Sequence, residues 1–371
     1  MSSDRSQASL NVTLLAGPNR VLRELVLEQL IEQAHADSRR LTVLTFDRER
    51  QLAPVDRAVE FQCAETKQIK IAQPGRIMPF RADLFLELSA INRKGTVEEV
   101  VIELASNGEL PAARDTLTQT FPGGINLGGI ARLTRCIIML EAAGLPQMFW
   151  TKEAAVEPEG LEDCNSESAC SRAHGLARSI ECADTVVLTD SFTGEPEQLG
   201  RAIRLLRAMN PELAVVDTRL LRFDSIPVLG SVNQQLQKTL TECVVSRSQA
   251  SWAIFDKDFA RMTIEACRPL HPQRFHEFIE GGWRGVLRGR GQVRIASQPA
   301  ASRHWSQTGR VGVLGSKTSD LRAGWSQTMT FVGDRDACIN ACSGFEESLL
   351  TDEEMELGSR IWLAFSDPLR D

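Results

Sequence analysis

The sequence has no run of about 18 apolar residues, which is the length that a membrane-spanning helix requires. Its first residues, MSSDRSQASLNV, lack the basic and then apolar segments of a signal peptide. It contains no internal repeat and no low-complexity tract. We therefore expect a globular cytoplasmic protein, and 371 residues, 42% of them hydrophobic and 25% charged, suffice for two or three domains.

The sequence also lacks a CxxC pair and a surplus of basic residues. Its nine cysteines are an odd number and are scattered along the chain, so we expect most of them to be reduced and several to fill core space. The 42 Lys and Arg residues are outnumbered by 49 Asp and Glu residues, which gives a net charge of −7. This balance argues against a protein that coats nucleic acid with its whole surface, although it allows a local basic patch.

The first half of the chain alternates short apolar strands with helical segments. We expect strands at Leu10–Ala16, Leu41–Phe46, Val97–Leu104, Arg135–Leu140, Ala183–Leu188 and Leu213–Asp217, and helices at Val21–Gln33 and Pro196–Met209. Strands that are apolar almost throughout are typical of a parallel sheet with helices on both faces. We therefore predict an α/β domain over residues 8–220, followed by a linker over residues 221–257.

The second half mixes strands and helices without strict alternation. We expect strands at Phe259–Ala266, Gly285–Ser297, Thr308–Leu314 and Gln327–Val332, and helices at His271–Glu280, Asp334–Ser343 and Asp352–Gly358. This mixture is typical of a small α+β domain, which we place at residues 258–371.

A strand followed by a glycine and a helix is where a P-loop binds phosphate, through the motif GxxxxGK[ST]. Counted from Gly17, the second glycine position is Leu22, the lysine position is Arg23 and the hydroxyl position is Glu24. The Leu22 side chain closes the space for phosphate, and the Glu24 carboxylate would repel the γ-phosphate. The segment is therefore either a P-loop that has lost its ligand chemistry or an ordinary βαβ unit that never bound a nucleotide.

Five blocks of the second half follow the order and spacing of a CobW-type C-terminal domain. They are RPLHPQRFHEFIE (Arg268–Glu280), VLRGRGQVRIASQP (Val286–Pro299), HWSQTGRVGVLG (His304–Gly315), MTFVGDRDACINA (Met329–Ala341) and SLLTDEEMELGSRIW (Ser348–Trp362). The chain resembles the CobW family of metallochaperone GTPases, in particular its zinc-responsive branch. The resemblance implies a P-loop-NTPase-like domain, with a mostly parallel sheet, before the CobW C-terminal domain. It also implies GTP hydrolysis coupled to delivery of a metal, usually zinc.

The GTPase motifs of that family are degenerate in this chain. The switch motif, Glu-Ser/Thr-x-Gly, corresponds to ELAS, in which only Glu103 matches. The base-recognition motif NKxD corresponds to TDSF, where Thr189 replaces the asparagine, Asp190 the lysine and Phe192 the final aspartate. A site that lacks those polar groups does not offer the hydrogen bonds by which guanine is selected. We therefore predict a pseudo-GTPase without catalytic residues, to which neither GTP nor zinc is an expected cofactor.

The family's metal motif CxCC is also missing, since it corresponds to RIMP at residues 76–79 and zinc prefers thiolate or imidazole ligands. A different metal site is conceivable at Cys164, Cys170 and His174, of which the last two are four residues apart, on one face of a helix. The alternative is that Cys170 faces the core while Cys164 and His174 lie on the surface.

A group of arginines offers a binding surface instead of a catalytic one. Residues 258–322 hold ten Arg and one Lys against five acidic residues, and Arg284, Arg288, Arg290 and Arg294 lie close together in sequence. With Trp283 and Trp305 nearby, they suit phosphate pairing and base stacking. The hypotheses are RNA or ribosome contact, or a basic face that docks onto the acidic N-terminal domain.

We therefore expect a protein of zinc homeostasis or the zinc-starvation response that acts by binding a macromolecular partner, with the ribosome or a ribosome-associated protein as candidates. We expect no membrane partner and no sequence-specific DNA binding. The alternative is a GTP-dependent zinc metallochaperone that uses Arg23 in place of lysine and an unusual Cys/His site.

Overall fold

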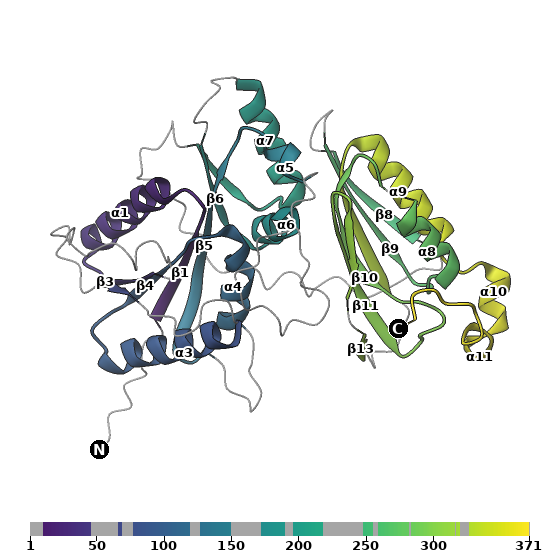
Figure 1. The fold of residues 1–371 in the computed structure, drawn as a ribbon, viewed down its shortest axis with the longest axis horizontal. Coiled ribbons are helices and arrows are strands. Elements are labelled where there is room, and N and C mark those ends of the chain that lie inside the picture. The colour runs from purple at the N-terminus through teal and green to yellow at the C-terminus, as the bar shows by residue number, and fades with distance from the viewer. Residues whose placement is uncertain are drawn as a thin grey trace, which may run out of the picture.

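Two β-sheets with their covering helices make up the computed structural model of the chain (Figure 1). The structure describes residues 10–45, 66–68, 77–118, 127–149, 172–189, 196–217, 248–254, 259–281, 283–315, 317–319 and 326–370. The first sheet belongs to the N-terminal half and the second to the C-terminal half. The predicted fold class, a P-loop-NTPase-like parallel sheet followed by a smaller α+β domain, is confirmed.

The first sheet is parallel, with the strand order β3-β2-β4-β1-β5-β6-β7. Its strands are β1 (Leu10–Ala16), β2 (Leu41–Thr45), β3 (Thr66–Gln68), β4 (Glu99–Leu104), β5 (Ala131–Glu141), β6 (Thr185–Thr189) and β7 (Ala214–Asp217). Every residue of β2, β4 and β6 is buried. Strands buried on both faces explain the continuous apolar runs in the sequence.

Helices cover this sheet on both faces. They are α1 (Arg20–Ala36), α3 (Ile77–Lys94), α4 (Leu110–Thr118), α5 (Leu145–Met148), α6 (Arg172–Cys182) and α7 (Pro196–Met209), with a 3₁₀ turn, η1, at Asn107–Glu109. Because successive side chains of a strand alternate between faces, Leu15 of β1 packs in the core under α1, whereas Leu14 packs in the core shared with the other helices.

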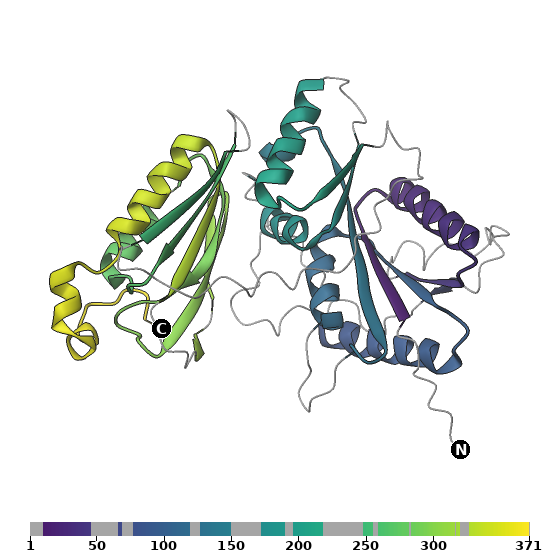
Figure 2. The ribbon, with the colours of Figure 1, turned by 180° about the vertical axis from the view of Figure 1, so that it is seen from behind.

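The second sheet is antiparallel, with the strand order β12-β11-β10-β14-β9-β8 and β13 paired to β11. Its strands are β8 (Ser248–Ile254), β9 (Ala260–Ala266), β10 (Val286–Val293), β11 (Ala301–Thr308), β12 (Val311–Leu314), β13 (Thr318–Ser319) and β14 (Gln327–Gly333). Its helices are α8 (Pro272–Glu280), α9 (Arg335–Glu347), α10 (Asp352–Leu357) and α11 (Ser359–Trp362). Both ribbon views show α8 and α9 on one face of this sheet and the first domain beyond the other face (Figures 1 and 2).

Two expectations for this region need correction. Strand β8 lies inside the expected linker, and its residues pair with β9 from Ser248 opposite Ala266 to Ile254 opposite Ala260. The second sheet therefore begins before residue 258. The expected strand Thr308–Leu314 is a hairpin instead, because the chain turns at Gly309, whose φ of 57° ends β11 before β12 begins.

None of the helices that the structure describes is both long enough and apolar enough to cross a membrane.

Candidate functional site

The turn between β1 and α1 is short and closed by a helix cap. α1 begins at Arg20, and the side chain of its N-cap residue, Asn19, accepts a hydrogen bond of 3.1 Å from the backbone N–H of Leu22. The N–H of Arg23 donates to the carbonyl of Asn19 at 3.0 Å. In a P-loop, backbone N–H groups of this region point at phosphate. Here two of them are already bonded within the first helical turn.

Gly17 is explained by packing rather than by phosphate. A Cβ atom added at Gly17 would lie 2.9 Å from both Cβ and Cε of Met139, a buried side chain of β5. The glycine therefore lets the turn approach the neighbouring strand. This contact alone accounts for the glycine that opens the motif.

The lysine position of the motif is filled by a buried ion pair. The Arg23 guanidinium donates from Nε to Oε1 of Glu103 at 3.1 Å, and the two side chains are only 2% and 0% exposed. Nη1 of Arg23 also donates to the carbonyls of Gly17 and, at 3.4 Å, of Ala105. The cation that should hold a phosphate is thus bound to a carboxylate at the end of β4 and to the turn itself.

Three of the other predicted nucleotide positions, Leu22, Glu24 and Thr189, also have contacts within the fold. Leu22 is buried in the core under α1, and Glu24 forms a half-exposed ion pair of 3.0 Å with Arg20. The Thr189 hydroxyl donates to the carbonyl of Leu140 at 3.3 Å. Asp190 and Phe192 lie outside the described residues.

Of the predicted Cys/His metal site, the structure describes only His174. Cys164 and Cys170 lie outside the described residues, as does Arg76 of the former CxCC segment. His174 is buried between the two domains. Within the described part of the chain, no group of three or more His, Cys, Asp or Glu side chains is arranged to hold a metal ion.

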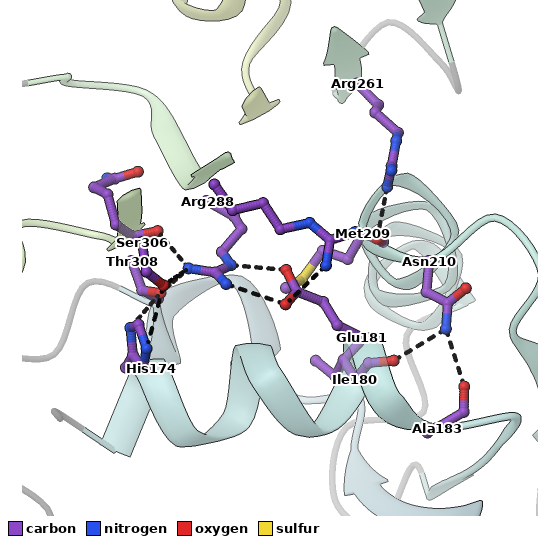
Figure 3. Close-up of polar contacts among 12 residues, drawn as sticks. His174, Ile180, Glu181, Ala183, Met209, Asn210, Arg261, Arg288, Ser306 and Thr308 are labelled. Atoms are coloured by element: carbon purple, nitrogen blue, oxygen red, sulfur yellow. Dashed lines mark hydrogen bonds and ion pairs between the residues drawn. The ribbon is translucent and has the colours of Figure 1, made fainter. Parts of the chain in front are cut away.

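An ion pair between the domains is the main polar contact of their interface (Figure 3). Arg288 of β10 binds Glu181 of α6 with two hydrogen bonds, from Nε at 2.8 Å and from Nη2 at 3.0 Å. Arg290 adds a contact of 3.2 Å to the same carboxylate. Burial alone would raise the pKa of Glu181, but the charges of Arg288 and Arg290 outweigh it, so that the pKa is lowered.

His174 lies beside this ion pair and contacts the second sheet. Its Nε2 is 3.3 Å from the Ser306 hydroxyl and its Nδ1 is 3.4 Å from the Thr308 hydroxyl (Figure 3). Burial, followed by the nearby charges of Arg288 and Arg178, lowers the pKa of His174 to about 4. The imidazole is therefore neutral at pH 7 and holds the interface by hydrogen bonds.

A third contact joins Arg261 of β9 to the end of α7. Its Nη1 donates to the carbonyl of Met209 at 2.8 Å and to that of Ala208 at 3.4 Å. Carbonyls at a helix C-terminus lack partners within the helix, and a cation suits them electrostatically. We call Glu181, His174, Arg288, Arg290, Ser306, Thr308 and Arg261 together the interdomain clamp.

The four predicted arginines do not form one exposed basic patch. Arg288 is buried in the clamp, the Arg294 side chain is also buried, and Arg290 is half-exposed against Glu181. Only Arg284 is exposed. Glu181 was not predicted from the sequence, because the excess of arginine in residues 258–322 indicates acidic partners but does not identify them.

The fold defines the class of the protein: a P-loop-NTPase-like domain joined to an α+β domain. Residues 259–339 match the family model described as the cobalamin synthesis protein cobW C-terminal domain. The zinc-regulated GTPase metalloprotein activator 1 of Dictyostelium discoideum is 21% identical over 329 residues, which are 78% of this chain and 67% of that protein. The second half of the chain therefore carries a CobW-type C-terminal domain, and most of the chain is similar to a zinc-regulated GTPase metalloprotein activator.

Two solved structures are similar to this chain at low identity. Zn(II)-bound YjiA GTPase from E. coli is 16% identical, with a TM-score of 0.34 over 91% of this chain and 99% of that chain. The hydrogenase maturation factor HypB from Archaeoglobus fulgidus is 8% identical, with a TM-score of 0.32 over 57% of this chain and 82% of that chain.

The buried imidazole of His174 makes stability depend on pH. Its folded pKa of about 4 lies below the ordinary value of 6.5, so the unfolded chain binds the proton more tightly. Neutral His174 makes its full contribution to the free energy of unfolding above pH 6.5. As the pH falls toward 4, the free energy of unfolding decreases by roughly 3 kcal/mol. We expect His174→Gln to reduce the dependence of the free energy of unfolding on pH, measured by urea unfolding from pH 7.5 to pH 4. Equal slopes for the variant and the wild type would contradict the assignment.

The buried Arg23–Glu103 pair predicts that the effects of its single and double substitutions on the free energy of unfolding do not add. Arg23→Ala or Glu103→Ala alone leaves a buried charge without its partner, which costs about 3–5 kcal/mol. The double variant Arg23→Met/Glu103→Met removes both charges and is expected to be close to the wild type in urea unfolding at pH 7.5. The half-exposed pair Arg20–Glu24 is the matched control, for which a double Ala variant should cost about 0–1 kcal/mol.

Proposed function

We propose that this CobW-family protein is a pseudo-GTPase that takes part in zinc homeostasis by binding a macromolecular partner in the cytoplasm. The observation that carries the proposal is the Arg23–Glu103 ion pair in the place of the phosphate-binding lysine. On this proposal the chain hydrolyses no GTP and performs no metal transfer coupled to hydrolysis.

A nucleotide phosphate and the Glu103 carboxylate would compete for one cation, the Arg23 guanidinium. A nucleotide phosphate would have to displace the Glu103 carboxylate from Arg23 and leave that carboxylate buried beside the incoming negative charge. Burying an unpaired carboxylate costs several kcal/mol, and the two anions repel each other. The hydroxyl that normally helps hold magnesium is replaced by Glu24, which pairs with Arg20 on the surface.

The alternative function, a GTP-dependent zinc metallochaperone, has one observation in its favour. The Dictyostelium relative, 21% identical, is named a zinc-regulated GTPase metalloprotein activator. An authentic GTPase would need Arg23 to leave Glu103 when the nucleotide binds. It would also need metal ligands that lie outside the described residues.

The ribosome is the partner that we propose first, with exposed basic residues as its contact. Arg288 and Arg294 are buried, so the contact would use exposed basic residues such as Arg284 and Arg310. The N–H of Gly309 donates to the carbonyl of Leu287 at 2.9 Å, which places the hairpin that carries Arg310 beside the start of β10. Two exposed arginines at one end of a sheet can pair with phosphates.

Calorimetric titration of the metal-free protein with GTP and magnesium, with and without zinc, tests the pseudo-GTPase proposal. We expect no saturable heat at protein concentrations that report a Kd of about 1 μM, which corresponds to roughly −8 kcal/mol. The Dictyostelium relative, titrated in the same way, is the comparison. Saturable binding of GTP would contradict the proposal and favour the metallochaperone.

Sedimentation with purified ribosomes tests the partner. We expect the protein to co-sediment at low salt, and the double variant Arg284→Glu/Arg310→Glu to lose most of this binding, because phosphate contacts weaken when a cation is reversed. Arg207→Glu, a change of an exposed arginine on α7 of the other domain, is the matched control and should bind like the wild type. Absence of the wild-type protein from the ribosome pellet at low salt would exclude this partner.

A further inference from the structure

Helix α6 contacts both the former phosphate site and the second domain. On one side it packs against the loop that follows Glu103: the Ser179 hydroxyl donates to the carbonyl of Asn107. A Cβ atom added at Gly175 would lie 3.6 Å from Cα of Gly108 in the same loop. Gly175 and Ser179 are four residues apart and lie on one face of the helix.

The face of α6 that carries His174 and Glu181 bears two components of the interdomain clamp. These residues are seven apart, which is two helical turns, so their side chains point the same way. Figure 3 shows them directed from α6 toward Arg288, Ser306 and Thr308 of the second sheet. Any shift of α6 therefore moves both contacts together.

Arg23 also contacts the start of the loop, after Glu103, against which α6 packs. Nη1 of Arg23 donates to the carbonyl of Ala105 at 3.4 Å, two residues beyond Glu103. The loop continues through Ser106, whose side chain caps η1 by accepting from the N–H of Gly108 at 3.1 Å. A continuous series of hydrogen bonds and packing contacts thus runs from Arg23 to the clamp.

We infer that the chain's own Arg23–Glu103 ion pair fixes α6, and through the interdomain clamp the C-terminal domain, in one position that does not depend on a nucleotide. This inference rests on the proposed pseudo-GTPase function, because it assigns to an internal ion pair the role of holding one conformation. A binding partner then meets the two domains as a single rigid surface. The Glu181 carboxylate, 9% exposed and held by two arginines, makes opening of the interface unfavourable.

The reactivity of His174 toward diethyl pyrocarbonate measures whether the interface is closed. The reagent modifies accessible imidazole rings, and the chain has only five histidines, so peptide mass spectrometry resolves each site. His174 is 5% exposed, whereas His304 is exposed and serves as an internal standard. In the wild type we expect His174 to be protected relative to His304, with or without GTP and magnesium.

Variants from both ends of the series should expose His174. Glu181→Ala removes the clamp directly, and Arg261→Met weakens it at a separate contact with α7. Arg23→Met/Glu103→Met acts at the far end, and its double change avoids a lone buried charge. We expect each to raise the modification rate of His174 at least about tenfold, as expected for local opening, while circular dichroism shows a folded protein.

The matched control is Arg20→Met/Glu24→Met, which removes a half-exposed ion pair from the same helix as Arg23 and should leave His174 protected. If the Glu181 and Arg261 variants leave His174 protected, the clamp does not hold the domains. If those variants expose His174 and Arg23→Met/Glu103→Met does not, the link from the ion pair to the clamp is wrong. Calorimetric binding of GTP without exposure of His174 would overturn the proposed function but not the fixed position of the domains.

Discussion

The buried ion pair between Arg23 and Glu103 is the interaction that joins the turn between β1 and α1 to the end of β4. A P-loop leaves a cation and several backbone N–H groups to be satisfied by phosphate. In this chain the same region is satisfied from within, by a carboxylate of β4 and by the carbonyls of Gly17 and Ala105. The planar guanidinium explains arginine in place of lysine, since one group reaches all three acceptors in fixed directions.

Arginine and glutamate are paired again at the domain interface. There Arg288 binds Glu181 with two hydrogen bonds and also donates to the Ser306 hydroxyl at 2.7 Å. Both ion pairs are removed from water, so the loss of one partner costs far more than the loss of a surface ion pair. Helix α6 lies between the two pairs, because it contacts the loop that follows Glu103 and also carries Glu181.

Helices and strands could be predicted where the spacing of apolar residues in the sequence shows which side chains are buried. They could not be predicted where residues far away in the sequence bury polar side chains. The helix Pro196–Met209 was predicted to the residue, because its apolar spacing and the following Asn210-Pro211 define it locally. Strand β11 was predicted only at its last residue. Its sequence, ASRHWSQT, is polar because Ser306 and Thr308 face the clamp.

The candidate site shows the same division. Motif positions identified Arg23 and Glu103 separately, but their pairing joins residues 80 apart in the sequence, and no local pattern reveals it. For Arg288 and Arg294 the composition indicated an exposed basic surface, because charge counts carry no information on burial. Glu181 is the single acidic residue of α6, and only the folded chain shows that it faces two arginines.

Several packing contacts, rather than one functional group, distinguish the turn between β1 and α1 from a P-loop. Leu22 is part of the core beneath α1, Asn19 caps that helix, and Gly17 is required by Met139. Restoring lysine at position 23 would leave Glu103 buried beside a shorter cation and would recover neither the glycine at position 22 nor the free backbone N–H groups. The turn is thus held in place by contacts within the chain, through the core under α1, the helix cap and the neighbouring strand β5.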